Sequence, residues 1–119
     1  MNTAIFFADG FEEIEGLTVV DMFRRAGIPI QTVSISDSLT VTGSHDIKVQ
    51  ADCLLKDFDF NTVEMLILPG GMPGTTNLSK CEPLCDALMQ FSRQGRYLAA
   101  ICAAPSILGG LGILNGRIA

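Results

Sequence analysis

Short apolar runs alternate with stretches of helical periodicity along this chain. Ile5–Ala8 and Met65–Leu68 are continuous apolar runs, and turn residues follow each of them at once: Asp9-Gly10 and Pro69-Gly70-Gly71. Ile5–Ala8 predicts a short apolar strand, and Met65–Leu68 is typical of a strand that is buried on both faces of a parallel sheet. Tyr97–Ile101 is predicted to be another such strand.

The segments between these runs predict helices. The first predicted helix carries apolar residues at three-residue steps: Ile14, Leu17, Val20, Phe23 and Ala26. Gly27 and Pro29 end it. A second helix is predicted from the apolar spacing of Leu84, Leu88 and Phe91. A third, short helix is predicted to begin at Pro105 and to end at the glycines that follow Leu108.

Two further segments have the character of strands. Residues 30–35 alternate between apolar and polar positions, and residues 39–42 and 47–50 flank Gly43-Ser44 like the arms of a hairpin. Strands that alternate with helices predict an α/β fold with an open, mostly parallel sheet. Sites in such folds form at the carboxyl ends of the strands. Three loops are predicted to meet there: 9–15, 69–74 and 102–105.

Length and composition predict one domain over residues 1–119, because 119 residues with 48% hydrophobic side chains suffice for one core. The net charge is −5 and no block of like charges occurs, which argues against nucleic acid or an anionic membrane as a partner. Small molecules or proteins are the expected partners. With neither a basic leader nor a run of about 18 apolar residues, the protein is predicted to be soluble and cytoplasmic.

The four cysteines, Cys53, Cys81, Cys85 and Cys102, are expected to be free thiols, since a chain this apolar needs no disulfide framework. Cys81 and Cys85 are four residues apart, but they lack a second pair of ligands. The only histidine, His45, is far away in sequence. No structural zinc site is therefore expected.

Cys102 follows an apolar strand and precedes the predicted helix at Pro105. A helix dipole and free amides at such a junction favour thiolate and lower the pKa of a cysteine. The alternative is that Cys102 is a small buried hydrophobe, which free cysteine often is.

Two other features point to the same edge of the sheet. Gly70 and Gly71 let the backbone approach a ligand and present N–H groups to an oxyanion, although a plain turn also explains them. Glu15 lies deeper in its helix than Glu12 and Glu13. A desolvated carboxyl group there would stay protonated and donate a hydrogen bond to a thiolate. The alternative is an acid that merely complements the helix dipole.

These motifs together resemble the ThiJ/PfpI family, especially its branch that contains the parkinsonism-associated deglycase. The resemblance is carried by residues 9–15 (DGFEEIE), 68–74 (LPGGMPG), 77–78 (NL) and 100–105 (AICAAP), in the family's order and over the whole chain. It implies a flavodoxin-like fold, similar to class I glutamine amidotransferases, and usually a homodimer. Cys102 would stand on a nucleophile elbow beside the family acid Glu15, with the backbone amides of Gly71 and Ala103 around it.

The chain departs from the family at its end. Family members continue past a segment like residues 115–119 into another strand, a residue that is histidine in several branches, and closing helices. The domain is therefore expected to be incomplete, with the remainder supplied as a continuation or as a second polypeptide. His45 is not expected to replace the missing third residue.

The resemblance leads to a cofactor-free, metal-free enzyme that acts on reactive carbonyls, of the glyoxalase or protein deglycase type. Cys102 would add to the aldehyde of a 2-oxoaldehyde or of its adduct on protein, amides of Gly71 and Ala103 would bind the oxyanion, and Glu15 would shuttle protons. The alternative is a non-catalytic oxidative-stress sensor or redox-regulated chaperone that uses the same cysteine. A cysteine peptidase is the third interpretation. It ranks last because such enzymes need a histidine base and the sequence shows no histidine in a suitable place.

Overall fold

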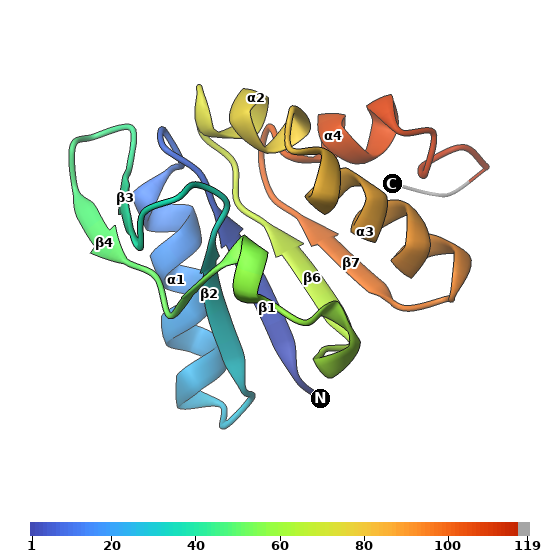
Figure 1. Cartoon of the computed structure of the whole chain (residues 1–119), viewed down its shortest axis with the longest axis horizontal. Helices are drawn as coiled ribbons and strands as arrows, with labels where there is room; N and C mark the ends of the chain where they lie inside the picture. Colours follow the sequence, from blue (N-terminus) through green and yellow to red (C-terminus); the bar gives the residue numbers. More distant parts are fainter. Residues whose placement is uncertain (117–119) are drawn as a thin grey trace.

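The computed structural model describes residues 1–116, and its centre is a five-stranded parallel sheet (Figure 1). The strands are β1 (Thr3–Phe7), β2 (Ile30–Ser34), β5 (Cys53–Leu54), β6 (Met65–Leu68) and β7 (Tyr97–Ala100). They lie in the order β5-β2-β1-β6-β7, and every neighbouring pair is parallel. All carboxyl ends therefore meet at one edge, as the sequence predicts.

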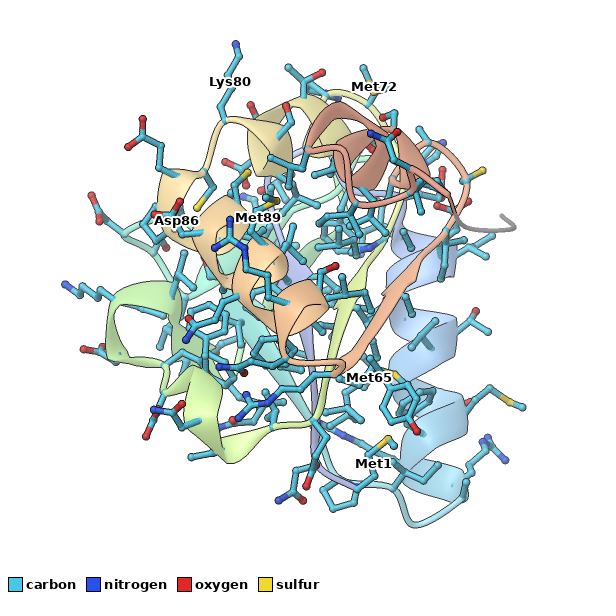
Figure 2. All side chains as sticks on the ribbon, turned by 90° about the vertical axis from the view of Figure 1, so that its right-hand side faces the viewer. Met1, Met65, Met72, Lys80, Asp86 and Met89 are labelled. Atoms are coloured by element: carbon cyan, nitrogen blue, oxygen red, sulfur yellow. The ribbon has the colours of Figure 1, made fainter. Side chains whose placement is uncertain are left out.

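Helices cover both faces of this sheet. Helix α1 (Glu13–Arg25) lies on one face and α3 (Glu82–Arg93) on the other, as Figure 2 shows. The short helices α2 (Gly74–Ser79) and α4 (Pro105–Gly110) lie near the carboxyl ends of β6 and β7 (Figure 1). In Figure 2, Met1 and Met65 mark the amino end of the sheet and Met72 marks the carboxyl end.

The alternation of side chains along β1 explains why both faces need cover. Phe6 belongs to the apolar cluster that includes α3, whereas Ile5 and Phe7 belong to the cluster on the side of α1. All three are at most 1% exposed. A strand with this pattern is stable only between two layers, so the prediction of an α/β fold with helices on both faces is confirmed.

A two-stranded antiparallel hairpin stands beside α1 at the carboxyl end of the sheet (Figure 1). It consists of β3 (Thr40–Thr42) and β4 (Lys48–Gln50), as expected from the sequence. Val41 is fully buried in the same cluster as Phe7 and Phe11. The hairpin is thus packed onto the body of the protein.

Several details differ from the sequence predictions. β7 is not buried on both faces: it is the outer strand of the described sheet, and Tyr97 is 57% exposed. Four short elements carry no apolar periodicity, so the sequence did not predict them. They are strand β5, helix α2 and the 3-10 turns at Leu55–Asp57 and Phe60–Thr62. On α1, Ile14 is exposed although its spacing predicts burial.

Within residues 1–116, no helix has the length and apolar character needed to cross a membrane. Cys53, Cys81, Cys85 and Cys102 are all free thiols, as expected.

Candidate active site

The three loops predicted to meet at the carboxyl edge of the sheet do meet there. The Glu12 N–H donates to the Gly70 carbonyl at 2.9 Å, which joins the start of α1 to the loop after β6. The Ile101 N–H donates to the Leu68 carbonyl at 3.1 Å, which joins the end of β6 to the turn after β7. Glu15, Gly70 and Cys102 are therefore neighbours, although they lie far apart in the sequence.

Cys102 occupies a sharp turn between β7 and α4. Its φ is 59°, a left-handed conformation that residues other than glycine rarely adopt. The turn is closed by a hydrogen bond from the Ala104 N–H to the Ile101 carbonyl at 3.0 Å. Cys102 is exposed, whereas Cys53, Cys81 and Cys85 are only partly exposed. A nucleophile elbow has this combination of strained backbone and accessible side chain.

Glu15 reaches the same point from the first turns of α1. Its Oε1 accepts a hydrogen bond from the Gly70 N–H at 3.0 Å. Gly70 is enclosed between the two functional side chains: a methyl group on it would lie 2.5 Å from Glu15 Oε1 and 2.8 Å from Cys102 Cβ. Only glycine leaves room for the carboxylate and the thiol to approach each other here.

The pKa of the Cys102 thiol is raised, whereas the sequence analysis expected it to be lowered. A hydrogen bond to the Glu15 carboxylate, followed by the charge of Glu15 and by burial, raises the pKa of the Cys102 thiol. A hydrogen bond from the Ala103 N–H lowers the pKa, but it does not outweigh them. The expectation relied on a helix dipole, and α4 has only six residues.

The three predicted amides play different parts. The Gly70 N–H is already bonded to Glu15 and is therefore not free for an oxyanion, contrary to expectation. The Ala103 N–H points to the thiol. Gly71 has a φ of 97°, and a side chain on it would collide with the Glu12 amide. Within residues 1–116 the Gly71 N–H has no partner in the protein.

His45 is much closer to this edge than its place in the sequence suggested. It lies on the turn between β3 and β4, with its Nδ1 3.0 Å from Glu13 Oε1 and 3.6 Å from Glu12 Oε1. Glu12, Glu13 and His45 thus gather their ligand atoms within 4.8 Å of one another. Hydrogen bonds to the hairpin already occupy both oxygens of Glu13, so the cluster needs no ion to explain it.

A large hollow lies at the opposite end of the sheet. It has a volume of about 510 Å³ and is lined by residues of the amino edge: Asn2, Thr3, Arg24, Gly27, Ile28, Pro29, Ile30, Gln31, Thr62 and Val63. None of these side chains is a cysteine, histidine or carboxylate. The candidate site residues Glu15, Gly70 and Cys102 therefore lie away from this hollow.

Comparison with known proteins decides the family. Residues 1–119 match the model of the DJ-1/PfpI family. The chain belongs to the DJ-1/PfpI family. It is 36% identical over 111 residues to "Protein DJ-1 homolog B" of Arabidopsis thaliana, which covers 92% of this chain and 25% of that protein.

Other DJ-1/PfpI members agree with the fold and widen the functional picture. The chain is 31% identical over 107 residues to "Glutathione-independent glyoxalase DJR-1.2" of Caenorhabditis elegans, covering 90% of this chain and 56% of that protein. The solved structure "Toxoplasma gondii DJ-1, oxidized" superposes with a TM-score of 0.93 at 34% identity, covering 97% of this chain and 63% of that one. The chain therefore spans less than two thirds of each of these relatives.

Proposed function

We propose that this protein is a cysteine-dependent, cofactor-free enzyme that acts on reactive carbonyls, with Cys102 as nucleophile and Glu15 as proton shuttle. The observation that carries the proposal is that Gly70 lies between these two side chains and in contact with both. The name of the C. elegans relative, a glutathione-independent glyoxalase, supports the choice of substrate class.

The raised pKa of Cys102 fits a nucleophile that is deprotonated only as it attacks. The sulfur bonds to the aldehyde carbon of a 2-oxoaldehyde while its proton passes to the Glu15 carboxylate. The carbonyl π electrons move to oxygen, and the alkoxide takes the proton back from Glu15, so that a neutral hemithioacetal forms. The Gly71 N–H and the Ala103 N–H are the candidate donors to the developing oxyanion, worth about 2.7–4 kcal/mol each where such donors have been removed.

The test uses methylglyoxal and the complete natural protein that contains this chain. Lactate formation is expected, because the conversion is an internal redox isomerisation that consumes one water and needs no external electron acceptor. Cys102→Ser is expected to abolish it, whereas the control Cys85→Ser, a thiol on α3, is expected to retain it. Full turnover by Cys102→Ser, or none by the wild type, would refute the proposal.

A second candidate is a redox sensor. The exposed Cys102 thiol favours it, and so does the Toxoplasma gondii relative, whose solved structure is of an oxidised form. Two equivalents of hydrogen peroxide would convert the thiol to sulfinate with release of two waters, and Glu15 would donate a hydrogen bond to the product when protonated. Mass spectrometry after titration with peroxide tests this: addition of two oxygens at Cys102 before any other cysteine supports the sensor, and preferential oxidation elsewhere contradicts it.

We also propose that the protein works as a homodimer through an apolar surface formed by Ile14, Leu17 and Ile47. Ile14 is 74% exposed and Ile47 is 50% exposed, and the three residues line a shallow hollow of about 360 Å³ beside the hairpin. Exposed apolar groups that gather in this way mark protein contacts. Sedimentation of the complete protein should show a dimer that Ile14→Glu dissociates, while Met22→Glu, also exposed and on α1, leaves it intact. A monomeric wild type would contradict the proposal.

The outer edge of β7 supports a further proposal, that another segment of the family domain pairs with it. Within the described residues β7 pairs only with β6, and unpaired strand edges invite association. Residues 1–119 expressed alone should aggregate or associate. A monomer with cooperative unfolding and full turnover would contradict this.

A further inference from the structure

Glu13 is a buried acid whose carboxylate serves the hairpin rather than its own helix. It is the first residue of α1 and is 3% exposed. The helix N-cap is Glu12, whose side chain accepts from the Ile14 N–H at 3.4 Å. Glu13 Oε2 instead accepts from the N–H groups of His45 at 2.8 Å and Ile47 at 3.2 Å. Its Oε1 lies 3.0 Å from His45 Nδ1.

The hairpin is shaped to receive this carboxylate. A methyl group on Gly43 would collide with the carboxyl group of Glu13. Because the φ of Gly43 is not in the left-handed region, space rather than backbone conformation explains the glycine here. The Ser44 N–H adds a hydrogen bond to the Phe11 carbonyl at 2.8 Å. The turn between β3 and β4 is thus docked on the residues that lead into α1.

The residues that lead into α1 are also bonded to the candidate active site. The Gly10 N–H donates to the Thr42 carbonyl of the hairpin at 2.8 Å, whereas the Glu12 N–H donates to the Gly70 carbonyl at 2.9 Å. Glu15 then accepts from the Gly70 N–H. One short stretch of backbone is therefore fixed between the hairpin and the loop that separates Glu15 from Cys102.

The charges at this contact keep it formed near neutral pH. Burial alone would raise the pKa of Glu13, but hydrogen bonds from the His45 side chain and from backbone N–H groups outweigh it and lower the pKa to about 2. The hydrogen bond to Glu13 and the charges of Glu12 and Glu13 raise the pKa of His45. The other charged groups of the hairpin and of the residues just before α1 are Asp9, Asp46 and Lys48, and Asp9 Oδ1 accepts from the Thr42 N–H at 3.0 Å. Helix α1 itself also carries Glu15, Asp21, Arg24 and Arg25.

We infer that Glu13 is a positioning residue for Cys102: by docking the hairpin through Gly43 and His45 it fixes the start of α1, and thereby holds Glu15 against Gly70 beside the thiol. The hydrogen bonds of the Glu13 carboxylate go to the hairpin and not to Cys102, so its effect on the thiol is transmitted through the backbone of residues 10–15. The inference depends on the proposed function only in taking Cys102 as the reactive residue.

The test is Glu13→Gln in the complete protein, with two readouts that use no carbonyl substrate. Hydrogen exchange of the His45 and Ile47 amides should become at least tenfold faster, because their acceptor is weakened. The pH profile of Cys102 alkylation by iodoacetamide should shift to lower pH, because Glu15 is no longer held beside the thiol. Asp21→Asn is the matched control: it removes the same charge from α1, at a side chain paired with Arg25 at 2.9 Å, and should change neither readout.

Two further variants keep the inference testable if Glu13→Gln does not fold. Gly43→Ala should shift both readouts in the same direction, and adding Glu13→Asp, which shortens the acid by one methylene, should restore part of the shift. His45→Gln should produce a smaller shift. If exchange accelerates while the alkylation profile stays in place, Glu13 serves the hairpin alone and the inference is wrong. It is also wrong if neither readout moves. Failure of methylglyoxal turnover in the wild type would leave both readouts unaffected.

Discussion

The two ends of the parallel sheet differ in what they offer a ligand. The amino end has a hollow of about 510 Å³ around the loop from Gly27 to Gln31. The carboxyl end brings together Glu15, Gly70 and Cys102 from three separate segments of the chain. Parallel strands bring the loops that follow them to one edge, whereas the other edge receives the chain returning from the helices. Volume alone therefore does not locate chemistry in this fold.

The strongest test of this contrast removes the proposed nucleophile. Cys102→Ser in the complete protein should reduce methylglyoxal turnover by at least about 100-fold, because a hydroxyl with no strong base beside it is a poor nucleophile. Arg24→Gln, in the lining of the large hollow, should leave turnover within about twofold, since its exposed pair with Asp52 is worth little. A larger loss in Arg24→Gln than in Cys102→Ser would move the active site to the amino end.

A pair of glycines tests the packing at the two ends. Gly70→Ala should cost about 1–3 kcal/mol of folding free energy, as overpacking does, and should reduce turnover about tenfold or more by separating Glu15 from Cys102. Gly27→Ala at the amino end has open space around it, so only its φ of 73° opposes a side chain, at about 1–2 kcal/mol. Urea unfolding and turnover should therefore separate the variants: both lose stability, but only Gly70→Ala loses activity. Equal activity in the two would refute the contact.

The contact between Glu15 and the thiol has its own signature. Because the Glu15 carboxylate raises the pKa of Cys102, Glu15→Gln should shift the pH profile of iodoacetamide alkylation to lower pH. Glu15→Asp keeps the charge but shortens the reach, so its profile should lie between those of the wild type and Glu15→Gln. Glu64→Gln, an acid just before β6 at the amino end, is the control and should not shift the profile. Identical profiles for all four proteins would show that Glu15 does not act on Cys102.

The smallest expected effect concerns pH and the hairpin. The folded pKa of His45 is raised above its ordinary value of 6.5, so its contribution to stability is complete below about pH 6.5 and is lost as the pH rises through the raised value. The folded pKa of Glu13 is lowered from 4.5 to about 2, so its contribution is complete above about pH 4.5 and is lost as the pH falls toward 2.

Urea midpoints of the wild type relative to His45→Gln should therefore differ most between about pH 4.5 and 6.5 and least above the raised pKa of His45. The difference should be small, because the His45 side chain is 65% exposed and solvent screens its charge. A difference that grows with alkaline pH would contradict the assignment.

The apolar pattern predicted the framework of the fold because a strand that is buried on both faces consists of consecutive apolar residues, which can be recognised in a sequence. β1 and β6 follow directly from the apolar runs at residues 5–8 and 65–68, and the loops after them carry the glycines that the site needs. Strand β5 has two residues and helix α2 has six, which is too short for any period to appear. Such elements are fixed by what surrounds them rather than by their own composition.

The sequence predicted that Glu15, Gly70 and Cys102 lie at the same edge of the sheet, but it did not predict the direction in which the pKa of Cys102 is shifted. Glu15 stood out from Glu12 and Glu13 by its apolar neighbours, yet Ile14 and Leu17 prove to be exposed. The prediction for the Cys102 pKa failed because the hydrogen bond to Glu15, a residue 87 positions earlier, and then the charge of Glu15 raise this pKa. The contact between Glu13 and His45 could not be predicted either, because it depends on how the hairpin folds back onto α1.

The left-handed backbone of Cys102 has a consequence for the evolution of the chain. A non-glycine residue at a φ of 59° costs about 1–2 kcal/mol, so glycine would relieve backbone strain at the position of the proposed nucleophile. Stability and activity therefore oppose each other at this residue. Exchange of this cysteine for glycine would relieve the strain and remove the proposed nucleophile in one step.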